Sequence, residues 1–271
     1  QLKLLTEKMT LSASLLMLLL LSLSHANPLT EEEEQDEEAD QSMEDVSYSI
    51  LKVNNETSEL LVEGDLIPPK TRNAIRCWSN SCLWQKGRDG KVTIAYTLSR
   101  QFTGREVQTI ERGLRSFHSS SCIRFVPRSN QYDYIRIESQ NGCYSSLGRQ
   151  GGAQILSLNK HGCLYHSTVQ HEVLHALGFR HEHNRSDRDR YVNIMWQNID
   201  RQMAYNFDKQ NTNNQNTPYD YTSVMHYGPT AFSIDGWKQT IVPFPNANVP
   251  IGQSRGMSRI DVKRLNLLYN C

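Results

Sequence analysis

An eleven-residue motif, HEVLHALGFRH at 171–181, constrains this chain more than any other part of its sequence. His171 and His175 are four residues apart, so on a helix their side chains project from the same face. Gly178 follows closely, and glycine lets a chain leave a helix in a backbone conformation that is costly for other residues. That turn can bring His181 back toward the first two histidines. The motif predicts a helix over about 167–177 that carries a three-histidine cluster.

This cluster has the composition of a catalytic zinc site. His171, His175 and His181 can hold one Zn²⁺ at ~2.0–2.1 Å, and three protein ligands leave a position open for water. A structural zinc ion would instead be closed by four protein ligands. Glu172 lies beside the first histidine, where it can take a proton from water and pass it to a leaving amine. The alternative, exposed histidines on an ordinary helix, is disfavoured because the glycine and the third histidine also occur at the required spacing.

A second motif follows the first along the chain. Residues 223–227 read SVMHY, and a later methionine turn completes the metzincin signature. A methionine by itself usually only packs in a core. Because Met225 follows the histidine motif, we expect it to form an apolar floor beneath the imidazoles. We expect the adjacent His226 to be structural.

Together these motifs resemble the astacin family of zinc endopeptidases, which are metzincins. The histidine motif continues as HEHNRSDRD at 181–189, and the resemblance covers essentially all of 73–271. It implies an α+β fold, an astacin-type catalytic domain of two lobes with a twisted, mostly antiparallel-edged sheet and a zinc-binding active-site helix. The stretch NAIRCWSNSCLW at 73–84 is similar to the start of mature teleost hatching enzymes and other six-cysteine astacins. This resemblance implies an egg-envelope substrate, with a different extracellular substrate in another tissue as the alternative.

The resemblance also implies roles for individual residues. Tyr227 matches a tyrosine that ligates zinc at rest and hydrogen-bonds the oxyanion during turnover. Glu182 matches an acid that anchors the new amino terminus after activation, here at or near Asn73. Asp65, in VEGD at 62–65, matches an inhibitory aspartate that displaces the catalytic water and keeps a zymogen silent.

The start of the chain has the pattern of a secretory signal. Residues 11–23 carry no charge, lysines precede them, and Ser-His-Ala follows. This pattern predicts a signal peptide over 1–26, starting at Met9 and cut after Ala26. A membrane anchor is disfavoured because a spanning helix needs ~20 apolar residues. We therefore expect a secreted, extracellular product without a membrane anchor, with storage in secretory granules as one route.

Charge is strongly segregated along the rest of the chain. Residues 27–72 hold 14 acidic and 3 basic residues, whereas 73–271 hold 14 acidic and 24 basic residues. An acidic segment followed by a basic one suggests that residues 27–72 are a pro-segment that covers a catalytic domain over 73–271. We call residues 73–271 the body. The alternative is a disordered solubilising tail. A trypsin-like protease that cuts after Arg72 would release the body.

Six cysteines downstream of a signal peptide indicate disulfides, most simply three, among fifteen possible arrangements. Zinc thiolates are disfavoured because the chain has no C-x-x-C pair. The spacing is compatible with one local pair, one pair across a hairpin-like stretch and one pair between the middle and the end of the chain. In that order these are Cys77–Cys82, Cys143–Cys163 and Cys122–Cys271. The resemblance implies the last two.

Hydrophobic periodicity predicts the remaining elements of the body. Alternating or apolar stretches predict strands near 92–96, 123–125, 135–137 and 155–158, and a helical face runs from 107 to 117. A last helix is expected to begin at Ser258, with Asp261 as a box-like cap. We expect it to point Ile260, Leu265 and Leu268 inward. The polar stretch 208–220 is expected to form a loop.

Three classes of function remain to be weighed. An active endopeptidase with one zinc ion per catalytic domain needs every residue of the motif, and all are present. A non-catalytic binding protein on the same scaffold would be favoured by loss of Glu172 or a ligand. The excess of basic residues suggests a nucleic-acid binder, but no binding motif occurs and secretion argues against it. We expect a monomer that acts on an extracellular protein.

Two sites match the N-glycosylation sequence, at Asn55 and Asn184. Asn55 would leave with the pro-segment. Asn184 lies within the extended histidine motif, and we expect it to be unmodified.

Overall fold

The computed structural model describes residues 45–68 and 81–271, and all of them belong to one compact unit. The predicted signal peptide over 1–26, the expected cut after Arg72 and the expected terminus at Asn73 lie outside the described residues. The predictions for these positions are therefore not addressed by the fold. Part of the predicted pro-segment is described, and it packs on the body.

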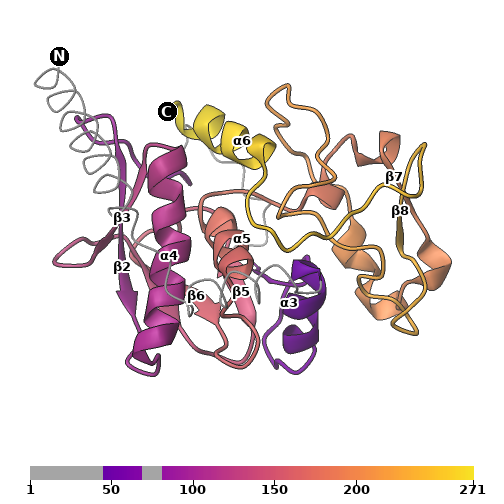
Figure 1. Ribbon diagram of the computed structural model, residues 1–271, viewed down its shortest axis with the longest axis horizontal. Coiled ribbons are helices and arrows are strands. Elements are labelled where there is room, and N and C mark those ends of the chain that lie inside the picture. The colour runs from indigo at the N-terminus through magenta and orange to yellow at the C-terminus, as the bar shows by residue number, and fades with distance from the viewer. Residues whose placement is uncertain (1–44, 69–80) are drawn as a thin grey trace, which may run out of the picture. The chain divides into compact units, whose positions relative to one another are not determined.

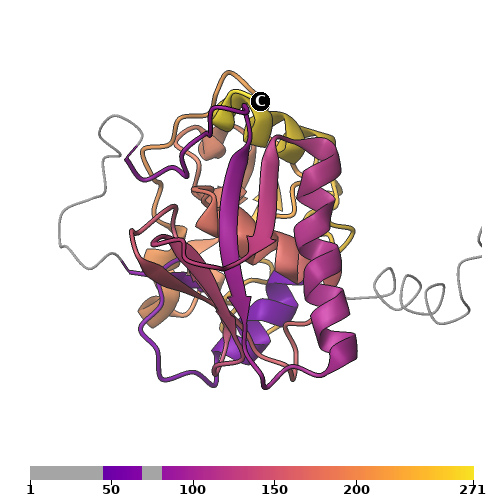
Figure 2. The same ribbon diagram turned by 90° about the vertical axis from the view of Figure 1, so that its left-hand side faces the viewer.

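A six-stranded sheet carries the first part of the body, with strand order β1-β5-β6-β4-β2-β3 (Figures 1 and 2). The strands are β1 (Leu66–Ile67), β2 (Val92–Leu98), β3 (Ile123–Pro127), β4 (Tyr134–Glu138), β5 (Cys143–Ser146) and β6 (Ala153–Leu158). Strands β3, β2, β4 and β6 run parallel to one another, and β5 runs antiparallel to β6. The short β1 comes from the predicted pro-segment and joins β5 in parallel. The sheet edge is thus closed by the segment expected to be removed.

The expectation of mostly antiparallel edges holds only for the pairing of β5 with β6, because the outermost strand β1 pairs with β5 in parallel. At the other edge β3 pairs with β2 in parallel, from Val92 opposite Ile123 to Tyr96 opposite Pro127. The reason is the connection between them, because helix α4 (Gly104–Ser120) returns the chain to the start of the sheet. Such a crossover gives parallel strands, whereas a tight hairpin would give antiparallel ones.

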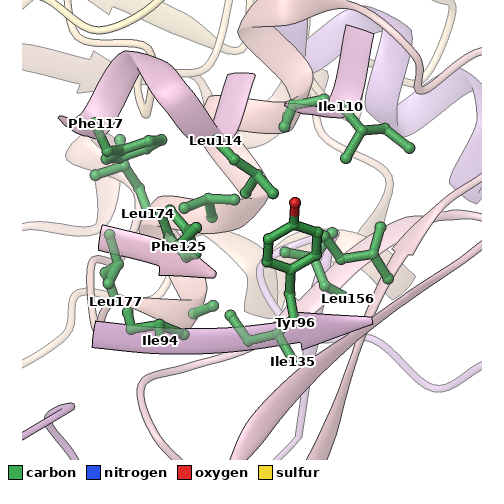
Figure 3. Close-up of a cluster of buried hydrophobic side chains, with 14 of the residues drawn as sticks. Ile94, Tyr96, Ile110, Leu114, Phe117, Phe125, Ile135, Leu156, Leu174 and Leu177 are labelled. Carbon is green, nitrogen blue, oxygen red and sulfur yellow. The ribbon is translucent and has the colours of Figure 1, made fainter. Parts of the chain in front are cut away.

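Helix α4 forms where the apolar spacing predicts it. Thr103 and Glu106 cap its first turn reciprocally, which satisfies two backbone N–H groups that a helix start leaves free. Figure 3 shows the apolar side chains of α4 in one cluster with those of the strands and of the next helix. This cluster contains Ile110, Leu114 and Phe117 of α4 together with Ile94, Phe125, Ile135, Leu156, Leu174 and Leu177. Helix α4 therefore covers one face of the sheet.

Helix α5 (His166–Ala176) carries the histidine motif and is almost wholly buried. It crosses close to α4, since a Cβ added at Gly113 would lie 2.5 Å from Val169 Cγ1. Gly178 has φ +104°, which confirms that the motif leaves the helix through a conformation suited to glycine. The predicted helix of 167–177 is correct to within one residue at each end.

The second half of the body is irregular and has its own apolar cluster. This cluster includes Val192, Phe207, Tyr219, Tyr227 and Ile241. Its regular elements are short: η2 (Glu182–Asn184), η3 (Arg188–Arg190), β7 (Val192–Ile194), η4 (Trp196–Asn198), η5 (Arg201–Phe207) and β8 (Ile241–Pro243). Strands β7 and β8 pair antiparallel. The described residues thus form two separate apolar clusters, one around the sheet and one in the irregular part of the body.

The last helix, α6 (Arg259–Tyr269), begins after Ser258 as predicted, and Asp261 completes the capping box. Leu265 is buried and Leu268 packs against the core, but the expectation for Ile260 was wrong, because Ile260 belongs to neither apolar cluster. The neighbouring Asp261 takes the buried position instead. Its carboxylate accepts hydrogen bonds from Ser223 Oγ and Val224 N, so a polar contact decides which way this first turn faces.

The predicted pro-segment contains a helix that was not predicted from its acidic sequence. Helix α3 (Val46–Asn54) is capped by Asp45, which accepts hydrogen bonds from the backbone N–H groups of Ser47 and Tyr48. Val46 and Ile50 are fully buried in the first apolar cluster. These residues are four apart, so they lie on one face of the helix. The segment is therefore anchored by apolar burial as well as by charge.

Two disulfides are seen among the described residues. Cys122 is bonded to Cys271, and Cys143 is bonded to Cys163 across the β5–β6 hairpin. Cys77 falls in the gap of the described ranges, so its pairing with Cys82 stays a prediction. None of the helices in the described ranges has both the length and the apolar composition that a membrane crossing needs.

Candidate metal centre and active site

Four side chains converge at the end of α5. His171, His175, His181 and Asp65 each offer one ligand atom, and these atoms lie within 4.8 Å of one another. All four residues are fully buried. The carboxylate of Asp65 lies between the imidazoles, with Oδ2 at 3.0 Å from His171 Nε2 and 3.1 Å from His181 Nε2. Its other oxygen lies 3.2 Å from His175 Nε2. The three motif histidines are thus brought together as their spacing predicts.

The hydrogen bonds behind the imidazoles orient them toward a cation. His171 Nδ1 lies 2.8 Å from the carbonyl oxygen of Val224, and His175 Nδ1 lies 2.7 Å from that of Phe179. A carbonyl can only accept, so each Nδ1 carries the proton and each Nε2 presents a lone pair to the centre. His171 Nε2 and His181 Nε2 nevertheless lie only 3.2 Å apart. Converging lone pairs and a carboxylate form a donor set that fits Zn²⁺.

Glu172 lies next to the first of these histidines and is fully buried. Neither of its carboxylate oxygens has a hydrogen-bond partner among the described residues. Burial, together with the nearby charge of Asp65, raises the pKa of Glu172 well above its usual value. A buried carboxyl group with free lone pairs beside a metal-type donor set has the properties required of a general base.

Asp65 reaches the centre through an unusual backbone turn. Gly64 has φ +88°, and a Cβ added there would lie 2.6 Å from the hydroxyl oxygen of Tyr227. Only glycine fits this turn without displacing its neighbours. Burial opposes ionisation of Asp65, but attraction to the His181 and His175 rings, which are positively charged when Nε2 is also protonated, holds its pKa well below the usual range. The carboxylate is therefore presented to the imidazoles in its ionised form.

Tyr227 is fully buried beside the cluster, with its ring 4.3 Å from that of His181 between centroids. Its hydroxyl group donates a hydrogen bond to the backbone carbonyl of Glu63, in the predicted pro-segment. The structure thus places the hydroxyl group on the segment and not among the four ligand atoms. Its expected roles as a resting zinc ligand and as an oxyanion donor stay predictions.

The methionine turn joins the two apolar clusters. Met225 belongs to the first apolar cluster and Tyr227 to the second. The backbone of the turn supports the site, because Val224 accepts the hydrogen bond of His171 and Met225 accepts the backbone N–H of Glu182 at 2.9 Å. His226 is held between Tyr219 and the backbone of Tyr227, which suits a structural role.

Glu182 is buried in a cluster of charges. Arg264 binds both of its oxygens, and Arg185 and the backbone N–H of Asp220 bind the same carboxylate. The expected partner, an amino group at Asn73, lies beyond the described ranges. The arginines were not singled out from the sequence, and they show that Glu182 already has positively charged neighbours before any cut.

Sequence reasoning also missed two polar contacts of the pro-segment. Glu63 forms an ion pair with Arg180 and lies 3.3 Å from His181 Nδ1 through its other oxygen. Asn54 binds Gly64 and both backbone groups of Cys143. Each contact joins segments that are distant in the sequence or depends on a tight turn, so no local pattern reveals it. Asn184 is fully buried, and its amide group donates to the carbonyls of Asn206 and Asp208.

Comparisons with known proteins agree with this geometry. Residues 80–270 match the family model described as Astacin, a peptidase family. The chain is 54% identical over 265 residues to high choriolytic enzyme 1 of Oryzias latipes, covering 96% of this chain and 98% of that protein. It is 48% identical over 266 residues to low choriolytic enzyme of the same fish, with the same coverage.

A solved structure gives the same result. High choriolytic enzyme 1, described as a hatching enzyme zinc-protease from Oryzias latipes, matches with a TM-score of 0.71 and 57% sequence identity. The match covers 73% of this chain and 100% of the solved one. With a histidine cluster suited to zinc, the chain therefore belongs to the astacin family of peptidases and is a zinc metalloendopeptidase.

Proposed function

We propose that this chain is the zymogen of a secreted astacin, with a signal peptide over 1–26, a pro-segment over 27–72 and a catalytic domain over 73–271. One observation carries the proposal: the carboxylate of Asp65 occupies the point on which three histidine Nε2 atoms converge. A substrate carbonyl would need the same place. The docked segment therefore blocks the site sterically and also supplies a competing ligand.

In the released enzyme, His171, His175 and His181 would hold the zinc ion. The ion supplies Lewis acidity toward the scissile carbonyl and the attacking water. Glu172 accepts a proton from that water and returns it to the leaving amine nitrogen. Its oxygens have no partner among the described residues, so this carboxylate need not break a hydrogen bond to act.

Release of the pro-segment also frees Tyr227. In the intact chain its hydroxyl group donates to the carbonyl of Glu63, and this acceptor would leave with the segment. The phenol can then donate to the oxyanion that forms on the substrate carbonyl. Met225 continues to support the site through its place in the turn, and the new terminus at or near Asn73 would join the charge cluster at Glu182.

Activation requires a cut near Arg72 by a protease of trypsin-like preference. After that cut, the segment is held by non-covalent contacts alone, including the burial of Val46 and Ile50. We propose that the enzyme is secreted, with storage in granules before release, and that it acts as a monomer.

The substrate proposal rests on the relatives. Two similar proteins are named choriolytic enzymes, and one solved structure is described as a hatching enzyme. We propose that this chain digests egg-envelope glycoproteins. The alternative is a six-cysteine astacin of another tissue that cleaves a different extracellular protein.

The first experiment compares the intact chain with the same protein after a trypsin cut, using a quenched fluorescent peptide library. The cut protein should cleave peptides, and Glu172→Gln or a zinc chelator should abolish cleavage. Glu111→Gln, which makes the same chemical change at a partly exposed position of α4, is the matched control. If cut, zinc-loaded and folded protein cleaves nothing, a non-catalytic binding role replaces this proposal.

A second experiment tests the substrate. Isolated teleost egg envelopes should lose protein into solution when treated with the activated enzyme, and Glu172→Gln should leave them intact. Cleavage of library peptides without any release from envelopes would favour the enzyme of another tissue.

A further inference from the structure

A fourth histidine, His183, follows the metal motif but is not one of the four residues whose ligand atoms converge. It is fully buried. Its imidazole ring lies nearly parallel to the phenol ring of Tyr227, with 4.2 Å between the ring centroids and 27° between the ring planes. The ring of His181 lies 4.3 Å from the same phenol and is tilted by 54°. His183 is therefore the histidine that stacks on Tyr227.

The body itself holds His183 in place. The buried Arg188 donates through Nη1 to the carbonyl of His183 at 2.9 Å and to the carbonyl of Phe207 at 2.6 Å. Phe207 is fully buried, and its ring centroid lies 5.6 Å from that of the imidazole. A side chain that is packed in this way, on a backbone that is hydrogen-bonded, keeps one orientation. His183 thus gives Tyr227 a fixed neighbour.

Tyr227 would depend on this neighbour once the pro-segment leaves. In the intact chain, the hydroxyl group donates to the carbonyl of Glu63, and Gly64 lies so close that an added Cβ would be 2.6 Å from the hydroxyl oxygen. Both contacts belong to the segment that would be removed. The contacts with His183 and His181 belong to the body and would stay. An oxyanion donor is effective only where it is held ready at the position of the developing charge.

We propose that His183 is a positioning residue for Tyr227. Its stacked ring fixes the plane of the phenol, so that the hydroxyl group released from Glu63 is directed toward the oxyanion of the substrate. The inference rests on the proposed function, because it requires peptide cleavage and a donor role for Tyr227. It gives His183 no contact with zinc, and the effect of His183 passes through the tyrosine alone.

The test measures kcat and KM of the trypsin-activated full-length protein on one quenched fluorescent peptide. Tyr227→Phe removes the hydroxyl group and should lower kcat roughly 100-fold. His183→Gln and His183→Leu remove the aromatic ring, and each should lower kcat roughly 5-fold, the order of the contribution of one aromatic pair, with KM within about 2-fold of the wild type. His183→Phe keeps a ring and should restore kcat. His161→Gln, at an exposed position, is the matched control.

A double-mutant cycle shows whether His183 acts through Tyr227. In the Tyr227→Phe background no hydroxyl group remains to be directed, so His183→Gln should cause no further loss of kcat. An equal loss in both backgrounds would mean that His183 acts independently of the tyrosine, and the assignment would be overturned. The zinc content of the intact His183 variants, measured by atomic absorption after dialysis, should equal that of the wild type. Loss of zinc would assign His183 to the metal centre and would also overturn the proposal.

The outcomes separate this inference from the function on which it rests. If the activated wild-type protein cleaves no peptide, the proposed function and this inference are both overturned. If it cleaves the peptide and Tyr227→Phe is equally fast, or if both ring-free variants of His183 keep the wild-type kcat, the enzyme proposal stands and the role of His183 is overturned. Failure of both ring-free variants to show a cooperative melting transition would assign His183 to the fold and would contradict the inference as well.

Discussion

Replacing Asn54 with alanine should loosen the pro-segment without altering the catalytic body. The side-chain amide of Asn54 donates to the carbonyls of Gly64 at 2.9 Å and Cys143 at 2.7 Å, and its oxygen accepts the backbone N–H of Cys143 at 2.7 Å. All three contacts are buried. At a net value of about 1 kcal/mol each, their loss would reduce the free energy of opening of the segment by about 3 kcal/mol.

Hydrogen exchange measured by mass spectrometry tests this directly. At 1.36 kcal/mol per factor of ten, the amides of residues 45–68 should exchange roughly 100-fold faster in Asn54→Ala. Asn55→Ala is the matched control, since it changes the adjacent, exposed asparagine of the same helix end. Equal exchange in the two variants would refute the view that this buried amide fastens the segment to β5.

Three further predictions concern the body. His118 Nε2 accepts the backbone N–H of Phe125 at 2.9 Å, and burial, with nearby arginine charges, lowers the pKa of His118 below its usual 6.5. The unfolded chain then binds the proton more readily, so this contribution is present above pH 6.5 and is lost as pH falls. Denaturant titrations should therefore show that His118→Gln loses less unfolding free energy between pH 7 and pH 5 than the wild type does. Gly113→Ala should lower the unfolding free energy by about 1–3 kcal/mol, because the new Cβ meets Val169. Gly104→Ala is the control and should not lower it, because its Cβ meets nothing within 4 Å. Unchanged stability of Gly113→Ala would contradict the close packing of α4 on α5. Zinc should raise the melting temperature of the intact chain, and a chelator should reverse that rise, because a ligand that binds the folded state alone stabilises it.

Local patterns predict the elements that are fixed by their own residues. The histidine motif predicts both the helix and the turn after it, because the spacing of His171 and His175 places them on one helical face and Gly178 favours the turn that ends the helix. Ser258 and Asp261 likewise fix the start of α6 through a capping box. The strand expectations succeeded where apolar residues alternate or form short runs.

Contacts between distant segments could not be predicted in this way. Helix α3 lies in a strongly acidic region, and its two buried apolar residues, Val46 and Ile50, are too few to form a clear pattern. The prediction that Ile260 points inward was wrong, because the buried hydrogen bonds of Asp261 set the orientation of this turn and hydrophobic periodicity does not. The ion pair of Glu63 with Arg180 depends on how the pro-segment lies across the body, which neither stretch specifies alone.

The most direct test of the account is a crystal structure of the intact chain grown with zinc, with anomalous diffraction measured at the zinc absorption edge. The account predicts a single strong peak bound by His171, His175, His181 and an oxygen of Asp65 at ~2.0–2.2 Å. A zinc ion at the three histidines with water in place of Asp65, or a zinc ion bound elsewhere, would contradict the claim that the pro-segment closes the metal centre.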